Sequence, residues 1–334
     1  MNILIIGGTQ FLGYYILEKL LESGHQITVF HRGIHRVPFE GVKEIKKDWH
    51  NSSETEKALK GKKFDVVINN ICFSEEDAYL SYKIFKNSTD HFIVISSAAV
   101  YLLNPDLNIP YLEEDALLEI PRYYKDSEKH LYAYGKREAD IYFLTKFTRA
   151  NFPCTILRPP VLVGKRDYTG RLATYFCQIE EDHPIILPDG GQNLWGFLYA
   201  EDLANFILKI LKNRRAFGKV YNLAQREAVS LRQLILKIGK ILGKIPKIVD
   251  IPSSFLIKTP LGVNFSPLWS PNHILLDINA AIRDFGFSPT PFSKWIEEMV
   301  LHFKKEPPLD QFKSTREMEK DTVEKYIKYF RGLN

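Results

Sequence analysis

Residues 1–24, MNILIIGGTQFLGYYILEKLLESG, contain the pattern that decides the fold. Residues 2–6 are a continuous apolar run, which is typical of a parallel strand buried on both faces. Apolar residues then recur at helical spacing from Phe11 to Leu20, and Ser23-Gly24 predicts the end of that helix. A second strand is expected at residues 26–30, so the segment predicts a strand, helix, strand unit.

The turn between the first strand and its helix reads Gly7-x-x-Gln10-x-x-Gly13. Gly7 permits a tight bend, Gly13 lets the helix approach the strand, and the N–H groups that start the helix would face a pyrophosphate. Because Gln10 replaces the middle glycine of the dinucleotide fingerprint, an α/β domain without a dinucleotide is the alternative. We predict a cofactor-binding turn made of Gly7, Thr9, Gln10, Phe11, Leu12 and Gly13.

Composition indicates an ordinary globular protein of 334 residues with a net charge of +5. The positive charge is spread along the chain, which favours a solvated surface over a nucleic-acid site. Cys72, Cys154 and Cys177 are scattered, so we expect no disulfide framework, no zinc or other metal site, and a reduced cytoplasmic location. The chain begins with a core strand and lacks a membrane-length apolar run, so neither a signal peptide nor a membrane anchor is expected.

Two positions after the second strand bear on the choice of cofactor. An acidic residue there would accept the ribose hydroxyls of NAD, but the chain has His31 and Arg32, which could bind a 2′-phosphate. NADP is therefore the preferred cofactor, and NAD remains possible. The alternative to phosphate binding is that Arg32 stacks on adenine or faces solvent. A third strand at residues 42–47 would place Asp48 where it could accept a hydrogen bond from the adenine amino group.

The remaining sheet strands are expected at residues 64–69, 91–96 and 153–157. Asn70 and Ile71 follow the first of these and would pass beneath the nicotinamide. Ser97 follows the second and lies at the carboxyl edge of the sheet, where parallel sheets bind ligands.

These elements predict an α/β fold with a Rossmann-type doubly wound parallel sheet and a smaller C-terminal α/β substrate lobe. We assign residues 1–164 to the dinucleotide-binding domain, to which 194–216 returns. The substrate lobe is expected from residues 165–193 and 217–305, and residues 306–334 should form a peripheral helix. A long helix at 128–149 should follow a surface excursion over residues 102–129.

Tyr132 precedes Lys136 by four residues on this long helix. An ammonium group beside a phenol lowers its pKa from about 10 toward neutrality and makes it a usable general base. Spacing alone does not select this pair, because Tyr15/Lys19, Tyr79/Lys83, Tyr82/Lys86 and Tyr142/Lys146 share it. Tyr132/Lys136 follows the Ser97 strand and lies on the helix that precedes the sixth strand, so we choose it by position.

Five motifs together resemble an extended short-chain dehydrogenase/reductase of the NAD(P)-dependent epimerase/dehydratase family. They are residues 7–13 (GGTQFLG), 96–101 (SSAAVY), 132–136 (YAYGK), 158–160 (RPP) and 202–204 (DLA). The resemblance covers residues 1–303 and implies a Rossmann fold, a C-terminal substrate lobe and a homodimer formed through the long helices. It also implies that Tyr132 is the acid/base, that Lys136 binds the nicotinamide ribose and that Ser97 holds the substrate oxygen. We add Pro159 to the cofactor-binding residues.

Departures from the family pattern narrow the expected substrate. In the nucleotide-sugar 4,6-dehydratases of this family, an Asp-Glu pair follows the strand-five Ser or Thr, and its carboxyl groups are needed to eliminate water. This chain has Ala98 and Ala99 at those positions, which disfavours dehydration. Val161 and Trp195 stand where epimerases hold a diphosphate. We therefore expect hydride transfer at a secondary alcohol or ketone of a sugar-like small molecule. The alternative is a nucleotide-sugar 4-epimerase that binds its diphosphate through Arg226 or Arg283.

The GGTQFLG opening also resembles a branch of the family that includes chloroplast RNA-binding members. An RNA-binding protein on the same scaffold is therefore a second hypothesis. Retention of Ser97, Tyr132 and Lys136 together favours the enzyme, so nucleic acid is not the expected partner.

Overall fold

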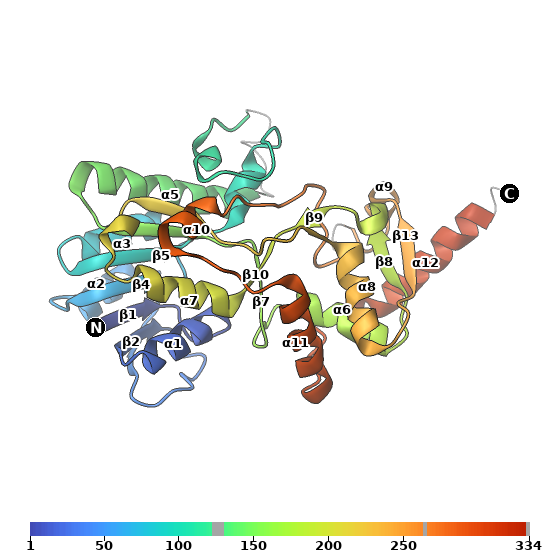
Figure 1. Cartoon of the computed structure of the whole chain (residues 1–334), viewed down its shortest axis with the longest axis horizontal. Coiled ribbons are helices and arrows are strands. Elements are labelled where there is room, and N and C mark those ends of the chain that lie inside the picture. The colour runs from blue at the N-terminus through green and yellow to red at the C-terminus, as the bar shows by residue number, and fades with distance from the viewer. Residues whose placement is uncertain (122–129, 263–265, 332–334) are drawn as a thin grey trace. The chain divides into compact units, whose positions relative to one another are not determined.

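The computed structural model describes residues 1–121, 130–262 and 266–331 (Figure 1). The chain forms two compact units, each assembled from three separate segments. Unit 1 comprises residues 1–162, 197–226 and 274–289, and unit 2 comprises residues 163–196, 227–273 and 290–334.

Unit 1 contains a seven-stranded sheet in the order β11-β6-β5-β4-β1-β2-β3, and every strand pairs with its neighbours in parallel. The strands are β1 (Asn2–Ile6), β2 (Gln26–His31), β3 (Lys43–Lys46), β4 (Phe64–Asn69), β5 (Thr89–Ile95), β6 (Cys154–Arg158) and β11 (Lys219–Asn222). The helices are α1 (Leu12–Glu22), α2 (Ser52–Leu59), α3 (Glu75–Phe85), α5 (Leu131–Ala150), α7 (Ala200–Ile210) and α10 (Asn279–Phe285). This arrangement confirms the predicted Rossmann-type doubly wound fold.

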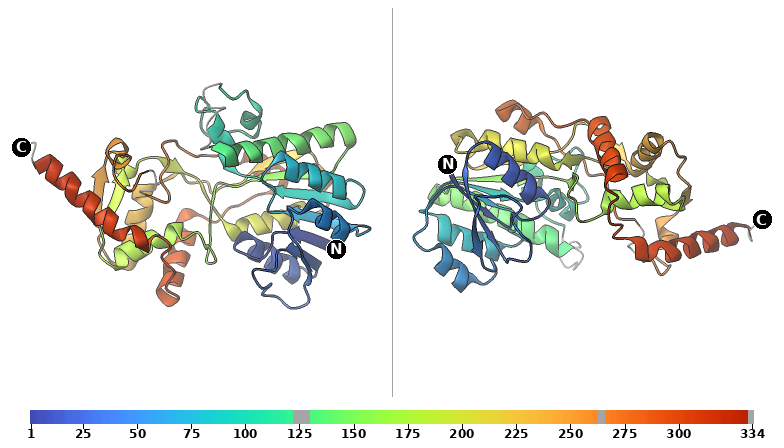
Figure 2. Two further views of the ribbon diagram at one scale, coloured as in Figure 1. Left: turned by 180° about the vertical axis from the view of Figure 1, so that it is seen from behind. Right: turned by 90° about the horizontal axis from the view of Figure 1, so that it is seen from below.

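Both faces of the sheet are covered by helices, as the apolar strand β1 requires (Figures 1 and 2). Alternate residues of β1 point to opposite faces, and Leu4 and Ile6 belong to a core cluster that also contains Phe85 of α3 and Phe143 of α5. Helices α1 and α7 contact each other, as do α3 and α5. Burial of large side chains such as these contributes roughly 1.5–3 kcal/mol each, so the strand and helix patterns reinforce one another.

The boundaries of the two units differ from the predicted ones at residues 194–196, 217–226 and 274–289. Residues 217–305 were expected to belong to the substrate lobe, but β11 pairs with β6 in the large sheet and residues 274–289 belong to unit 1. Tyr111 bridges to Leu276, and the Tyr221 hydroxyl donates to Asp284 at 3.1 Å. These contacts hold residues 274–289 in unit 1 after the chain has passed through unit 2 at residues 227–273. The predicted start of the long helix, residues 128 and 129, lies outside the described residues.

Unit 2 contains short strands and five helices among its described residues. They are α6 (Arg171–Glu180), β8 (Ile185–Pro188), β9 (Leu194–Trp195), β12 (Val229–Ser230), α8 (Leu231–Leu242), β13 (Ile248–Ile251), α9 (Ser253–Leu256), α11 (Phe292–Lys305) and α12 (Arg316–Arg331). β8 pairs with β13 in parallel, and β9 pairs with β12 in antiparallel. The short strands β7 (Val161–Val163) and β10 (Phe197–Tyr199) form a separate pair.

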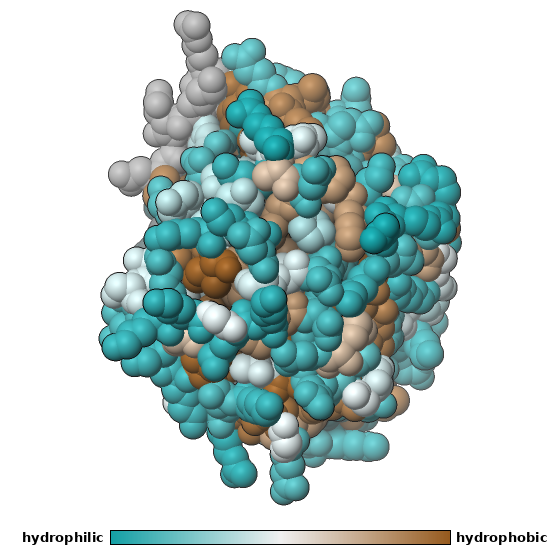
Figure 3. Space-filling model, turned by 90° about the vertical axis from the view of Figure 1, so that its left-hand side faces the viewer, coloured by the Kyte–Doolittle hydropathy of each residue, from teal (hydrophilic) through white to brown (hydrophobic). Residues whose placement is uncertain are grey.

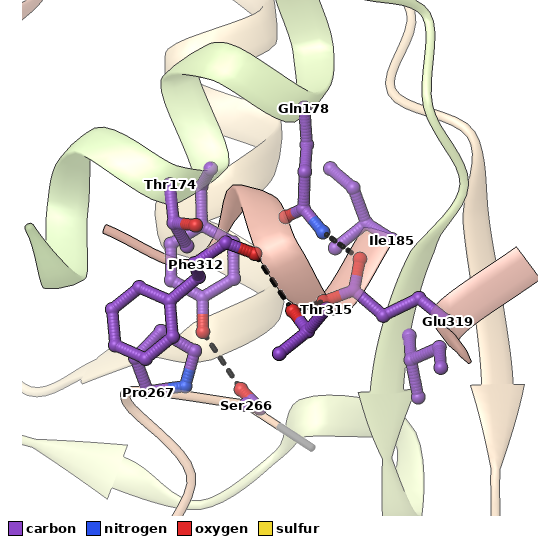
Figure 4. Close-up of a pocket in the computed structure, with 10 residues that line it drawn as sticks. Thr174, Gln178, Ile185, Ser266, Pro267, Phe312, Thr315 and Glu319 are labelled. Atoms are coloured by element: carbon purple, nitrogen blue, oxygen red, sulfur yellow. Dashed lines mark hydrogen bonds between the residues drawn. The ribbon is translucent and has the colours of Figure 1, made fainter. Parts of the chain in front are cut away.

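The C-terminal helix α12, which the sequence predicted as a peripheral helix, is anchored in unit 2 through buried polar groups. The Glu319 carboxylate accepts hydrogen bonds from Gln178 at 3.0 Å, Arg316 at 3.2 Å and Thr315 at 3.0 Å, and lies 3.0 Å from His183. A small cavity lies beside this group, lined by side chains that include Thr174, Tyr175, Gln178, Ser266, Phe312 and Thr315 (Figure 4). The Glu319 carboxylate thus links α12 to α6 and to His183, which follows α6.

One face of the molecule illustrates the polarity of its surface. The face drawn in Figure 3 is mainly hydrophilic, with small separate hydrophobic areas. None of the helices within the described residues is both long and apolar enough to cross a membrane.

His91 of β5 is a fully buried histidine whose hydrogen bonds fix its neutral form. Its Nδ1 accepts the backbone N–H of Lys212 at 3.2 Å. Its Nε2 lies 2.8 Å from the Thr155 hydroxyl, which itself donates to the carbonyl of Ala216 at 2.7 Å. Nε2 must therefore carry the proton and donate to Thr155. Burial lowers the pKa of His91 from 6.5 to about 3.

We predict that His91 makes the stability of unit 1 depend on pH between 6.5 and 3. Between these pH values the histidine is protonated in the unfolded chain but stays neutral in the folded protein. The free energy of unfolding therefore falls as pH falls, by up to about 1.4 kcal/mol per pH unit. Urea unfolding between pH 7 and pH 4 measures this slope. The variant His91→Gln should have a shallower slope than the wild type, and equal slopes would contradict the assignment.

Candidate active site

The glycine turn brings β1 and α1 into close contact. Gly7 has a φ of 74°, and a side chain there would overlap Ile71. A Cβ on Gly13 would lie 2.5 Å from the Cα of Gly8, so α1 reaches this position only because residue 13 has no side chain. Gln10 is exposed, so its side chain lies on the surface of the turn.

The other residues predicted in this turn complete its path into α1. Thr9 and Phe11 are half-buried and Leu12 is buried. Phe11 adopts a φ of 39° at the N-cap of α1, a backbone conformation that non-glycine residues rarely adopt. Such strain is retained where the surrounding structure imposes it, and ligand-binding turns are a common place for it.

The loop after β4 lies directly against the glycine turn. The Asn70 side-chain amide donates to the carbonyl of Gly7 at 3.2 Å, and the N–H of Ile71 donates to the Asn69 side chain at 2.9 Å. Asn70 Oδ1 is buried and has no hydrogen-bond partner within the described residues. A buried acceptor without a partner costs about 1–3 kcal/mol, so this oxygen is suited to a donor from a ligand.

The residues predicted to bind the adenosine end are found in different environments. His31 is buried, lies 2.7 Å from a Glu44 carboxylate oxygen and accepts the N–H of Gly33 at 3.2 Å, so it is already paired within the protein. Arg32 is exposed. Asp48 is also exposed, and one of its carboxylate oxygens accepts the N–H of His50 at 3.1 Å.

Ser97 and Pro159 lie together at the carboxyl edge of the sheet. The Ser97 hydroxyl accepts the N–H of Ala99 at 3.1 Å and so caps the 3₁₀ turn at Ala98–Leu103. The N–H of Ala98 donates to the carbonyl of Pro159 at 2.9 Å, which joins the ends of β5 and β6.

Tyr132 and Lys136 lie one turn apart at the start of α5, and their burial differs strongly. Tyr132 is 51% exposed, whereas Lys136 is 2% exposed and is the only buried lysine within the described residues. The Lys136 ammonium donates to the carbonyl of Ile95 at 2.8 Å and lies 5.9 Å from the centre of the Tyr132 ring. Burial lowers the pKa of Lys136, and the nearby Cys72, Asp140 and Asp77 oppose that shift.

An ion pair between Asp140 and Arg158 is buried one turn beyond Lys136. Asp140 accepts from Arg158 at 2.8 Å and from the Ser96 hydroxyl at 2.9 Å. Arg158 also donates to the Tyr101 hydroxyl at 3.0 Å and to the carbonyl of Glu113 at 2.7 Å. Burial raises the pKa of Asp140, and the Arg158 guanidinium, the Ser96 hydroxyl and the Lys136 ammonium oppose this shift.

Sequence reasoning missed two residues of this site, Phe73 and Gly135. The Lys136 ammonium lies 4.5 Å from the centre of the Phe73 ring, and a side chain on Gly135 would overlap the Phe73 carbonyl. Gly135 was visible inside the helical motif YAYGK, where glycine costs about 1 kcal/mol relative to alanine. That cost indicates a close approach, although only the structure identifies Phe73 as the neighbour.

The sheet and this site define the class of protein, a Rossmann-fold protein of the short-chain dehydrogenase/reductase type. The sequence model of the NAD dependent epimerase/dehydratase family matches residues 3–81 and 78–224, and the chain belongs to that family. Within the described residues, no group of three or more His, Cys, Asp or Glu side chains could hold a metal ion.

Similar proteins differ in what their names describe. The chain is 26% identical over 252 residues to the chloroplast stem-loop binding protein of 41 kDa b from Arabidopsis thaliana, covering 72% of this chain and 62% of that protein. It is 23% identical over 265 residues to 2′-dehydrokanamycin reductase from Streptomyces kanamyceticus, covering 76% and 70%. The solved UDP-glucose 4-epimerase of Thermotoga maritima has the same fold, with a TM-score of 0.74, 17% identity, and 91% of this chain and 99% of that chain covered.

We predict that Asp140→Asn destabilises the protein by about 3–5 kcal/mol, because it leaves the buried Arg158 guanidinium without a counter-charge. Urea unfolding measures the loss. The double variant Asp140→Asn, Arg158→Met should lose less than the sum of the single variants. The exposed pair between Asp90 and Lys212, at 2.8 Å, supplies the control, since Asp90→Asn should cost less than about 1 kcal/mol. An additive double variant would contradict the coupling.

Proposed function

We propose that this protein is an NAD(P)-dependent oxidoreductase or epimerase that acts at a secondary alcohol or ketone of a sugar-like substrate, with Tyr132 as the acid/base. The observation that carries the proposal is the burial of Lys136. Of the five tyrosine and lysine pairs with this spacing, only this one has a buried lysine. A buried ammonium acts on a neighbouring phenol in a low dielectric, where its effect on the phenol pKa is largest.

Two features of unit 1 support a bound dinucleotide. Gly13 lies so close to the backbone of Gly8 that any side chain would overlap it, as in the close helix approach of a dinucleotide-binding turn, and Asn70 Oδ1 is a buried acceptor that lacks a donor within the described residues. Gly7, Thr9, Gln10, Phe11, Leu12, Gly13, Asn70, Ile71 and Pro159 are the proposed binding residues, together with Lys136. When bound, a dinucleotide would supply hydride-transfer chemistry at the substrate carbon.

The acid and base roles belong to this chain's own residues. In the oxidative direction the Tyr132 phenolate takes the proton of the substrate hydroxyl as the carbonyl forms, and in the reductive direction it gives that proton back. Lys136 stabilises the phenolate. Ser97 would donate its hydroxyl hydrogen to the substrate oxygen, since its own oxygen already accepts from Ala99.

We propose a substrate without a nucleotide diphosphate. Ala98 and Ala99 provide no carboxyl group for elimination, so dehydration remains disfavoured. Val161 and the buried Trp195 offer no charge, and Arg283 is paired with Asp284 at 2.9 Å. The likeness to a protein named 2′-dehydrokanamycin reductase supports this class. The rival is a nucleotide-sugar 4-epimerase, and turnover of a UDP-sugar that Arg226→Ala abolishes would favour it.

The assembly and the domain roles complete the proposal. Unit 2 would supply the substrate-binding residues. A homodimer would form through α3 and α5, where Tyr79 is 54% exposed. A cytoplasmic location fits three free cysteines.

RNA binding on the same scaffold is the second candidate, favoured by the likeness to a stem-loop binding protein. Retention on RNA that falls steeply with salt, without any change in NADPH fluorescence, would support this candidate over the enzyme.

We predict that Tyr132→Phe lowers turnover by about two to four orders of magnitude while the cofactor still binds, because only the proton relay is lost. The assay is oxidation or reduction of a panel of unlinked sugars and small ketones, followed by NAD(P)H absorbance. Tyr15→Phe, Tyr82→Phe and Tyr142→Phe are matched controls. An equal loss in one of them, without unfolding, would show that the wrong pair was chosen.

We predict that the protein binds NADPH more tightly than NADH, and that Arg32→Ala removes the difference. Arg32 is exposed directly after β2, where it can reach a 2′-phosphate. His31, the other residue predicted to bind that phosphate, is already paired with Glu44. Calorimetric titration of both cofactors measures the preference. Equal affinities in the wild type would overturn the role of Arg32 and leave the enzyme proposal intact.

A further inference from the structure

The aromatic ring of Phe73 covers the ammonium group of Lys136. The ammonium nitrogen lies 4.5 Å from the ring centre, and the ring also contacts Tyr132 with 6.3 Å between the two ring centres. Lys136 is 2% exposed, whereas Phe73 is 41% exposed. The ring therefore lies on the solvent side of the ammonium and touches both members of the proposed acid/base pair.

The backbone of Phe73 is held in place from two sides. Its N–H donates to the buried carboxylate of Asp77, in the first turn of α3, at 2.8 Å. Its carbonyl packs against Gly135 of α5, where any side chain would overlap it. The position of the ring is thus fixed by α3 and by α5, the helix that carries Lys136.

Several charged or titratable groups face the ammonium of Lys136. They come from α5 (Tyr132 and Asp140), from the loop after β4 (Cys72) and from α3 (Asp77). Asp140 is already paired with Arg158, and Cys72 is a buried thiol whose pKa burial raises, so it is neutral. The face of an aromatic ring attracts a cation by about 0.5–2 kcal/mol, which makes Phe73 a significant partner for this ammonium.

We propose that Phe73 is a positioning residue, which holds the Lys136 ammonium charged and directed at the Ile95 carbonyl for its work beside Tyr132 and the dinucleotide. The part that concerns the dinucleotide rests on the proposed function. The part that concerns Lys136 rests on the geometry of the chain alone. An aliphatic residue of similar size would keep the ammonium covered but would lose the attraction of the ring.

The experiment compares Phe73→Leu, Phe73→Tyr and the wild type, with Phe330→Leu as the matched control at a ring that is 49% exposed on α12. Lysine side-chain NMR with ¹⁵N, assigned through Lys136→Arg, follows the titration of the ammonium in the protein without cofactor. Fluorescence titration with NADPH and NADH follows binding. We expect Phe73→Leu to lower the titration midpoint by roughly 0.4–1.5 pH units and to weaken binding about two- to tenfold. Phe73→Tyr and Phe330→Leu should match the wild type.

Each outcome decides one of the two claims. A wild-type midpoint in Phe73→Leu, or equal shifts in Phe73→Leu and Phe73→Tyr, would overturn the positioning role. If the wild type binds neither NADPH nor NADH, the proposed function fails, and the titration of Lys136 still tests the role of Phe73.

Discussion

The buried ion pair between Asp140 and Arg158 is the interaction on which the candidate site depends. It joins α5 to β6 directly, and to the segment that follows β5 through Ser96 and Tyr101. The Tyr101 hydroxyl continues the network to Asn222 of β11 at 2.7 Å. Because an unpaired charge at this depth is strongly destabilising, any arrangement of these elements that separates the pair is disfavoured. That arrangement fixes the first turns of α5, and with them Lys136.

Much of the fold could be predicted because its strands are buried on both faces. A continuous apolar run as short as residues 2–6 is typical of a buried parallel strand, and the glycine turn fixes where that strand ends. The boundary of the second lobe was harder, since β11 has only four residues and its partner β6 lies far away in the sequence. Long-range pairing of this kind leaves no local pattern, so the prediction placed residues 217–226 and 274–289 in the substrate lobe, whereas they pack in unit 1.

In the candidate site, too, residues could be predicted where the local sequence marks them, but not where their role depends on contacts between distant segments. Ser97, Tyr132 and Lys136 could be selected by their order relative to the strands. His31 could not be separated from Arg32 by sequence, because its pairing with Glu44 depends on the register of β2 and β3. Phe73 lies in a loop without a pattern of its own, and its importance follows from a contact with a helix about sixty residues later in the chain.

The segmented construction of the two units has a consequence for how the protein folds during synthesis. The chain passes between the units at residues 162/163, 196/197, 226/227, 273/274 and 289/290. Unit 1 lacks its edge strand β11 until residue 222 has left the ribosome, and it lacks α10 until residue 285 has followed. An N-terminal fragment therefore exposes the edge of β6 and the apolar surface that α10 covers, and such surfaces favour aggregation. The nascent chain therefore keeps such surfaces uncovered over most of its length, and neither unit can be produced alone by a single truncation.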